Sequence, residues 1–173
     1  MVKQIPKVLI SEERIAARVA ELGAQISEDY KDKDLLMVGA LKGSVVFMSD
    51  LMRAVDCPMS IDFISASSYG SGVNTSGVVK IVQDMTQDIA GRDVLIIEDI
   101  LDTGTTLSHL TKMLLARGPK SLKLAALLEK PSRKTENIHA DYVGFTIPNV
   151  FVVGYGLDYD ELYRNLPYVG VFD

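Results

Sequence analysis

The sequence of 173 residues contains a single cysteine, two histidines and no tryptophan. With Cys57 alone, neither an intramolecular disulfide framework nor a cysteine-rich metal site can form, and this composition fits a reducing cytoplasm. No nearby histidine would activate Cys57, which favours a small apolar packing role over that of a nucleophile. His109 and His139 have no second His or Cys at ligand spacing, so we expect neither of them to bind a metal.

The chain also lacks an excess of positive charge and any long apolar run. Its formal net charge of -5 provides no basic surface for nucleic acid or an anionic membrane. Charged residues interrupt every apolar run below membrane-spanning length, and residues 1–10 lack the apolar core of a signal peptide. We therefore expect one globular domain, residues 1–173, in the cytoplasm, with neither nucleic acid nor membrane as a partner.

The stretch around which the chain is organised is residues 94–107, V-L-I-I-E-D-I-L-D-T-G-T-T-L. Its first four residues are typical of a strand buried on both faces of a parallel sheet. Glu98 and Asp99 follow at once, and Asp102 opens a turn before an amphipathic segment begins. Ligands of parallel sheets bind outside the carboxyl ends of the strands, where we expect these carboxylates to lie.

The turn after this strand allows two interpretations. It consists of Asp102, Thr103, Gly104, Thr105 and Thr106. Thr or Asp can merely cap a helix, or Gly104 can bring free amides and threonine hydroxyls around a phosphate monoester. Capping alone does not explain Glu98 beside Asp99, because adjacent carboxylates repel each other unless a cation or a diol compensates them. The whole pattern favours a site for a phosphorylated, hydroxyl-rich ligand.

A second loop of this kind contains a lysine. Residues 35–41 read as a buried strand, and Lys42, Gly43 and Ser44 separate this strand from an apolar helical run over residues 45–52. The lysine can be a solvated turn residue, since matches this short are often accidental. We nevertheless expect it on the same edge of the sheet as the acidic pair.

The remaining segments predict the fold class. Ser11 can cap a helix with apolar residues at helical spacing from Ile15 to Ile26, a further helix follows the acidic turn, and residues 121–128 form another buried strand. This alternation predicts an α/β fold with a mainly parallel sheet flanked by helices. From Pro131 onward, aromatic and β-branched runs separated by glycine suggest short strands in a small lobe, including residues 142–145.

Residues 68–77, S-Y-G-S-G-V-N-T-S-G, predict a flexible loop. Ile61 and Phe63 before the loop alternate with polar residues, as in a half-exposed strand, and residues 78–83 would return antiparallel to that strand. The residues alone leave open whether this is an ordinary hairpin or a lid over a site.

Residues 94–107 resemble the 5-phosphoribosyl diphosphate (PRPP) signature of the type I phosphoribosyltransferases. Together with the Lys-Gly loop, the glycine-rich loop and the aromatic C-terminal segment, the chain resembles the bacterial hypoxanthine-guanine phosphoribosyltransferases from about residue 8 to its end. The resemblance implies the fold of that family, with a core over about residues 8–130, a purine-binding hood over about 131–173 and a flexible loop.

The resemblance also implies a role for each segment. The turn from Asp102 to Thr106 would bind the 5-phosphate of PRPP, while Glu98 and Asp99 would hold the ribose diol and, through it, Mg²⁺. Pyrophosphate would be bound by Leu41, Lys42, Gly43 and Arg164, and the Leu41–Lys42 bond is often cis in the family. Ser68 and Tyr69 would close over the reacting centre and exclude water.

For the hood, the resemblance implies a site for a 6-oxopurine. Lys130 would donate to the exocyclic oxygen, Phe151 would stack on the ring, and the backbone of Val152 would read its far edge. Asp158 would lie at the purine site and hold a second magnesium ion through water. A lysine favours a carbonyl acceptor and disfavours the amino group of adenine.

The expected reaction transfers ribose 5-phosphate from PRPP to hypoxanthine or guanine and gives IMP or GMP and pyrophosphate, with Mg²⁺ as cofactor and Asp102 as general base. The alternative is a regulator that binds PRPP without catalysis. It is disfavoured by the negative net charge of the chain, which does not suit DNA binding, and by the presence of Asp102, Lys42 and Lys130. Xanthine stays open as a base. The family implies a homodimer or a homotetramer.

Overall fold

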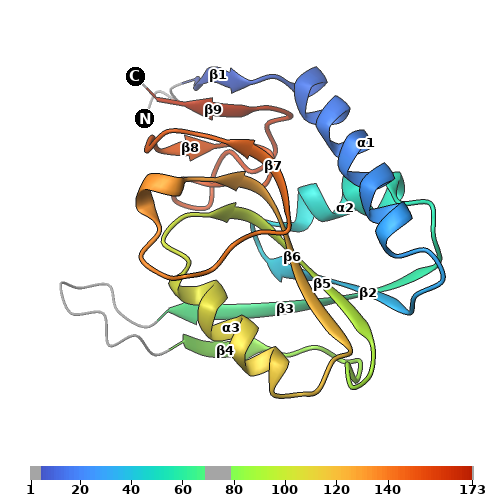
Figure 1. Ribbon diagram of the computed structural model, residues 1–173. Coiled ribbons are helices and arrows are strands. Elements are labelled where there is room, and N and C mark those ends of the chain that lie inside the picture. The colour runs from blue at the N-terminus through green and yellow to red at the C-terminus, as the bar shows by residue number, and fades with distance from the viewer. Residues whose placement is uncertain (1–4, 69–78, 173) are drawn as a thin grey trace.

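The computed structural model describes residues 5–68 and 79–172, which form two β-sheets and three α-helices (Figure 1). The larger sheet has the strand order β4-β3-β2-β5-β6-β7. Its strands are β2 (Leu35–Leu41), β3 (Met59–Ser68), β4 (Val79–Gln83), β5 (Asp93–Leu101), β6 (Ser121–Glu129) and β7 (Tyr142–Thr146). Every pair of neighbours is parallel except β3 and β4. The predicted α/β fold with a mainly parallel sheet is confirmed.

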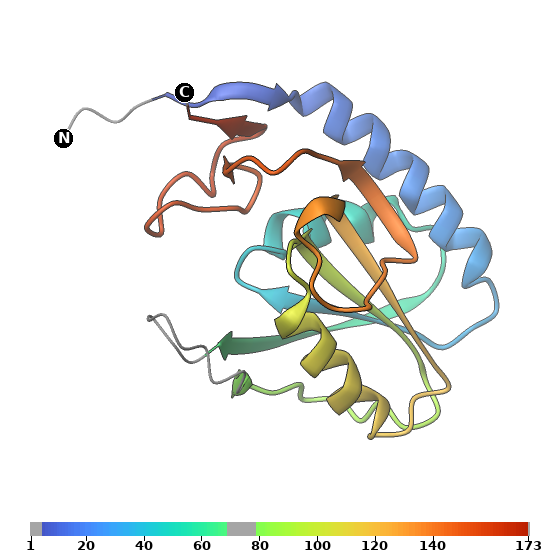
Figure 2. The same cartoon turned by 60° about the vertical axis from the view of Figure 1, so that its left-hand side comes forward.

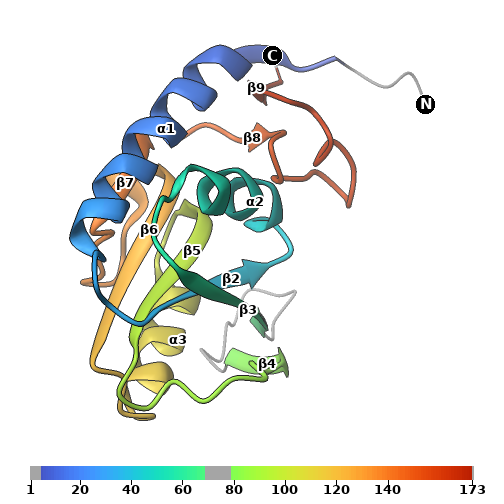
Figure 3. The same cartoon turned by 90° about the vertical axis from the view of Figure 1, so that its right-hand side faces the viewer.

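Helices cover both faces of this sheet. Figures 2 and 3 show α1 (Glu12–Asp29) and α2 (Val45–Ala54) on one side of the strands and α3 (Thr105–Leu115) on the other. Ser11 caps α1 by accepting a hydrogen bond from the backbone amide of Arg14, as predicted. A short 3-10 helix, η1 (Pro131–Arg133), follows β6. None of the described helices combines the length and the apolar character needed to cross a bilayer.

The central strands are apolar because both of their faces are buried. Leu95 and Ile97 of β5 pack in the core under α1 and α2, whereas Val94 and Ile96 pack in the core under α3. Burying one such side chain contributes about 1.5–3 kcal/mol to folding. The continuous apolar run of β5 thereby fixes the strand at the centre of the sheet.

The strand order reverses between β2 and β5. The chain leaves β2 through α2 and adds β3 on one side, and it leaves β5 through α3 and adds β6 on the other side. In such sheets the crevice outside the carboxyl ends of the two central strands is the place where ligands bind. The Lys-Gly loop after β2 and the acidic turn after β5 meet at this crevice.

A second sheet forms the small lobe. It contains β1 (Lys7–Ile10), β9 (Val169–Val171) and β8 (Val152–Val153), with β9 in the middle and antiparallel to both neighbours (Figure 1). The prediction that residues 142–145 belong to this lobe is wrong, because β7 pairs with β6 in the larger sheet. Aromatic and β-branched runs indicate a strand but carry no information about its partner.

The β3–β4 hairpin arms pair antiparallel, as predicted. Loop residues 69–78, with Tyr69, lie outside the described residues, and of Ser68 only its place in β3 is described. Of the two apolar residues in the strand expected to be half exposed, Phe63 packs against the core, whereas Ile61 is 39% exposed and its polar neighbour Asp62 is buried. The Asp62 carboxylate accepts 2.8 Å hydrogen bonds from the amides of Thr86 and Gln87, which satisfies a buried charge that the pattern of polarity could not anticipate.

Candidate active site

Two cavities adjoin at the crevice between β2 and β5, each of about 250 Å³. The first is lined from the β2 side by Leu41 and Gly43, and from the C-terminal segment by Asp158 and Arg164. The second is lined by the turn from Asp102 to Thr106. Glu98 and Thr106 line both cavities, so together the two cavities form one elongated site.

The acidic pair lies in β5 itself. We expected the strand to end at Ile97, but β5 continues to Leu101 and the pair is not in a loop. Pairing with β2 stops at Ile97, whereas pairing with β6 continues through Glu98 to Leu101. One edge of β5 is therefore free of β2 at the site, while the other edge holds the carboxylates rigidly on the sheet.

The chemistry of this pair fits a bound cation. Burial, followed by the neighbouring Asp99 carboxylate, raises the pKa of Glu98 well above its ordinary value. A cation or a hydroxyl donor in the cavity would offset the free-energy cost of ionising Glu98 next to Asp99. Within the described residues, no group of three His, Cys, Asp or Glu side chains is placed to hold a metal. Two carboxylates with an incomplete shell suit Mg²⁺, which keeps several waters and takes further oxygens from its substrate.

Gly43 and Gly156 permit a close approach of three segments. A Cβ atom at Gly43 would overlap the Asp99 carboxylate, and a Cβ atom at Gly156 would overlap the carbonyl oxygen of Gly43. The backbone of the loop after β2 is thus packed against the side chain of Asp99 on one side and against the backbone of the C-terminal segment on the other. The Leu41–Lys42 peptide bond in this loop is cis.

The turn after β5 presents the start of α3 to the second cavity. Gly104 is the N-cap residue, with φ at 85°, a backbone conformation that glycine adopts without strain. Gly104 has no side chain to close the helix end, and the hydroxyl of Thr103 accepts a long hydrogen bond, 3.5 Å, from the backbone amide of Thr105. Capping by Thr103 and anion binding by the turn are therefore both compatible with this geometry. The amides of the first turn and the positive end of the helix dipole lie at a cavity that suits an anion.

Asp102 is held between two cations. Its Oδ1 accepts a 3.0 Å hydrogen bond from Nε of Arg133, and its Oδ2 lies 3.6 Å from Nζ of Lys130. Lys130 is only 6% exposed, and its backbone amide donates to the carbonyl of Leu101. The buried lysine therefore lies at the end of β6 next to the turn, where one charge compensates the other.

The other expected anion ligands contact one another through Glu161. Nζ of Lys42 lies 2.8 Å from Oε2 of Glu161, and Nη2 of Arg164 lies 3.4 Å from Oε1 of the same carboxylate. Arg164 also pairs with Asp158 at 2.9 Å and donates to the carbonyl of Gly156 at 2.8 Å. The described structure thus gathers Lys42, Arg164 and Asp158 beside the first cavity.

The aromatic residue predicted for the purine is exposed. The Phe151 side chain is 58% exposed and packs edge to face against Tyr159, with 5.7 Å between ring centroids. Val152 is buried in β8. Neither residue lines the two cavities at the crevice.

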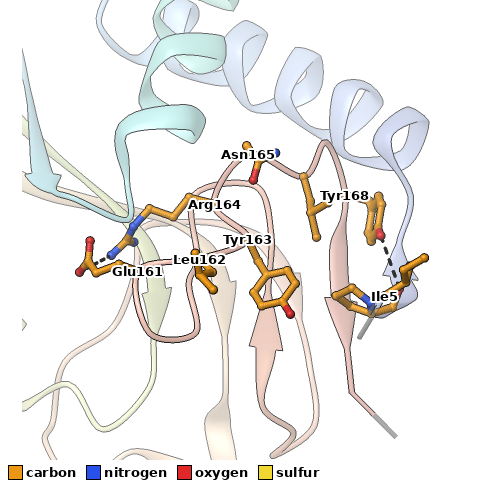
Figure 4. Close-up of a pocket in the computed structure, with 9 residues that line it drawn as sticks. Ile5, Glu161, Leu162, Tyr163, Arg164, Asn165 and Tyr168 are labelled. Atoms are coloured by element: carbon orange, nitrogen blue, oxygen red, sulfur yellow. Dashed lines mark hydrogen bonds and ion pairs between the residues drawn. The ribbon is translucent and has the colours of Figure 1, made fainter. Parts of the chain in front are cut away.

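Two larger cavities, of about 460 and 430 Å³, lie outside this crevice. Figure 4 shows the first of them, between Ile5 and the segment from Glu161 to Tyr168. The second lies between α1, α2 and the same segment. Both cavities adjoin Arg164, but neither is lined by the acidic pair or by the turn from Asp102 to Thr106. The two smaller cavities therefore form the candidate active site.

Sequence reasoning missed three residues at the site: Arg133, Gly156 and Glu161. Arg133 contacts Asp102, and its signal was the basic run Lys130 to Lys134 after β6. The sequence signal for Glu161 was its position between Asp158 and Arg164, two residues already expected at the site. Its contact with Lys42 joins positions far apart in the chain, and no local pattern predicts such a contact.

Comparison with known proteins finds similarity over nearly the whole chain. Residues 9–160 match the family model of the phosphoribosyl transferase domain. The hypoxanthine phosphoribosyltransferase of Escherichia coli K12 is 52% identical over 97% of this chain and 96% of its own length. The hypoxanthine-guanine phosphoribosyltransferase of Mycobacterium tuberculosis CDC 1551 is 52% identical over 98% of this chain and 87% of its own. A crystal structure of hypoxanthine phosphoribosyltransferase from Staphylococcus aureus matches with a TM-score of 0.94 and 53% identity, covering 96% of this chain and 91% of that one.

Proposed function

Because the chain belongs to the phosphoribosyltransferase family, we propose that it is a purine salvage enzyme that transfers ribose 5-phosphate from PRPP to hypoxanthine or guanine. The products are IMP or GMP and pyrophosphate. The single observation that carries this proposal is the pair of adjoining cavities that share Glu98 and Thr106. One cavity suits a phosphate and the other offers carboxylates and cations, as a ribose with phosphates at both ends requires.

The 5-phosphate is bound by the turn from Asp102 to Thr106, where free amides at the start of α3 donate to its oxygens. Glu98 and Asp99 accept hydrogen bonds from the two ribose hydroxyls. Leu41, Lys42 and Gly43, together with Arg164, bind the pyrophosphate group at the other end of the first cavity. The sugar carbon that reacts is thereby fixed between the two anionic groups.

The purine is bound between the turn and the small lobe. Lys130 donates to the exocyclic oxygen of a 6-oxopurine, Phe151 stacks on the ring and the backbone of Val152 contacts its far edge. The ring nitrogen forms a bond to the sugar carbon while the bond from that carbon to pyrophosphate breaks. Asp102 accepts the proton that leaves the purine, and its position beside Lys130 supports this assignment.

The carboxylates of Glu98 and Asp99, with Asp158 at a second position, would hold Mg²⁺. The bound ion supplies charge stabilisation for the departing pyrophosphate. Ser68 and Tyr69 belong to the proposed lid, which would exclude water from the reacting sugar carbon. A cytoplasmic location and assembly as a homodimer or homotetramer complete the proposal, and light scattering of the purified protein would measure the assembly.

The test is a panel assay with PRPP and Mg²⁺ in which hypoxanthine, guanine, xanthine, adenine and uracil are offered separately. We expect nucleotide to form from hypoxanthine or guanine and the reaction to stop when the metal is chelated. Binding of PRPP without conversion of any base would refute catalysis and favour a PRPP sensor. Conversion of adenine faster than hypoxanthine would refute the role of Lys130.

A further inference from the structure

Glu161 occupies the position of an anion between the two cations of the pyrophosphate site. Its two carboxylate oxygens contact different partners: Oε2 lies 2.8 Å from Nζ of Lys42, and Oε1 lies 3.4 Å from Nη2 of Arg164. Figure 4 shows the guanidinium of Arg164 extended toward this carboxylate. A pyrophosphate oxygen that engaged Lys42 and Arg164 would need the same two donors.

The ion pair between Lys42 and Glu161 is weak enough for a bound anion to displace it. The side chains of Lys42 and Glu161 are 67% and 64% exposed, and ion pairs this exposed to water are weak. A pyrophosphate carries more charge than a carboxylate and offers more acceptor oxygens, so it outcompetes Glu161 for the same donors. Arg164 keeps its contacts to Asp158 and to the carbonyl of Gly156 when Glu161 leaves.

The backbone that carries Glu161 is also unusual. Asp160, Glu161 and Tyr163 have φ values of 52°, 63° and 76°, in the left-handed region that residues with a side chain seldom adopt. The amide of Glu161 donates to Oδ2 of Asp158 at 2.9 Å. This short turn therefore aims the carboxylate of Glu161 at Lys42 at the expense of local strain, as is common at functional sites.

We propose that Glu161 is a built-in competitor for the pyrophosphate site, which holds Lys42 and Arg164 before PRPP binds and re-engages them as pyrophosphate leaves. The proposal rests on the proposed function, under which these two cations bind pyrophosphate. Its effect is to weaken the binding of pyrophosphate and to speed its release. The affinity of a nucleotide product without pyrophosphate, such as IMP, is left unchanged.

The test compares the wild-type protein with Glu161→Gln and with Asp160→Asn. Both substitutions remove one negative charge from the same turn, but Asp160 forms no ion pair within the described part of the chain. Isothermal titration with inorganic pyrophosphate and Mg²⁺ measures the affinity of the site, and titration with IMP is the internal control. Stopped-flow displacement of pyrophosphate measures its rate of release.

For Glu161→Gln we expect pyrophosphate to bind about three- to fivefold more tightly and to dissociate more slowly, which is the scale of one exposed ion pair. Asp160→Asn should change the affinity for pyrophosphate less than Glu161→Gln does, and neither variant should change the affinity for IMP. Unchanged or weaker pyrophosphate binding by Glu161→Gln would overturn the proposal and leave the proposed function intact. Wild-type protein that binds IMP but no pyrophosphate would overturn the pyrophosphate site and, with it, the competitor.

Discussion

The ammonium group of Lys130 lies 3.6 Å from a carboxylate oxygen of Asp102, which joins the end of β6 to the turn after β5. The lysine is buried, so its charge depends on this partner more than a surface charge would. The residue proposed to select the purine is therefore next to the residue proposed to take its proton. A change at either position is expected to affect both recognition and catalysis.

Replacing Asp102 by Asn should lower kcat by about 10²–10⁴-fold, the usual contribution of a general base. The KM for PRPP should change much less, because in the proposed site the phosphate is bound mainly by backbone amides of the turn at the start of α3. Steady-state kinetics with PRPP varied at saturating hypoxanthine separate the two constants.

Arg133→Gln is the matched control for Asp102, since it removes the exposed partner of the same carboxylate and leaves the carboxylate in place. It should retain kcat within a factor of about five, because exposed ion pairs contribute little. Equal losses in kcat and in PRPP binding for Asp102→Asn would show that Asp102 acts through binding alone.

Replacing Lys130 by Gln should lower kcat/KM for hypoxanthine by about 10- to 100-fold, the scale of a lost charged hydrogen bond at a buried site. The loss should be smaller for adenine, whose amino group gains nothing from a lysine. Parallel assays with hypoxanthine, guanine and adenine measure this selectivity. An equal loss for all three bases would assign Lys130 a role in supporting Asp102 alone.

Tyr155 links the C-terminal segment to α2. Its buried hydroxyl donates to the carboxylate of Asp50, and its amide donates to the carbonyl of Leu166 at 2.8 Å. Burial, then the hydrogen bond to Asp50, raises the pKa of Tyr155, so the hydroxyl stays protonated and remains a donor at neutral pH. Gly156, the next residue, contacts both Arg164 and Gly43.

Tyr155→Phe should therefore destabilise the protein by about 1–3 kcal/mol, because it removes the hydrogen bond from a buried hydroxyl to the Asp50 carboxylate, which then keeps its contact with Arg53. It should also raise the KM for PRPP, since Gly156 and Arg164 are less firmly placed. Urea unfolding and steady-state kinetics measure the two effects. Tyr159→Phe makes the same change at an exposed side chain and should leave the free energy of unfolding unaltered. Identical unfolding curves for the two variants would contradict the proposed link.

Asp84 and Arg117 provide a pH-dependent contribution to stability. Two hydrogen bonds from the Arg117 guanidinium, at 2.8 and 2.7 Å, lower the pKa of Asp84 below its ordinary value. On acidification the unfolded chain then takes up the proton first. The contribution is present above about pH 4, the ordinary range of an aspartate, and is lost as the pH falls through the lowered pKa of the folded protein.

Asp84→Asn should accordingly lower the free energy of unfolding at pH 7 and have a smaller effect near pH 3. The loss should stay below about 1 kcal/mol, because the Asp84 side chain is half exposed. Urea unfolding at both pH values measures it. Asp56→Asn, at an exposed carboxylate with no ion pair among the described residues, serves as the control. A loss of equal size at pH 3 and pH 7 would rule out the pH-dependent contribution.

Local sequence patterns were sufficient to predict the helix and strand elements on which the site is built. The apolar run of β5, the strand over Leu35–Leu41, the Ser11 cap and the positive φ of Gly104 are all as predicted. Each depends on neighbours within one or two turns of the chain, where side-chain chemistry acts directly on the backbone. The sequence also showed Asp102 in the turn that follows Glu98 and Asp99, for the same reason.

Pairing between distant segments was decided only by the tertiary structure. Strand β7 joined the larger sheet, β1 joined the small lobe, and Asp62 is buried while its neighbour Ile61 is exposed. The contacts of Lys42 with Glu161 and of Asp102 with Arg133 likewise join segments remote in the chain. A sequence pattern records which face of an element is apolar, but which partner covers that face depends on the packing of the whole chain. The sequence by itself therefore determined the parts of this site, and the fold decided which of its charges face one another.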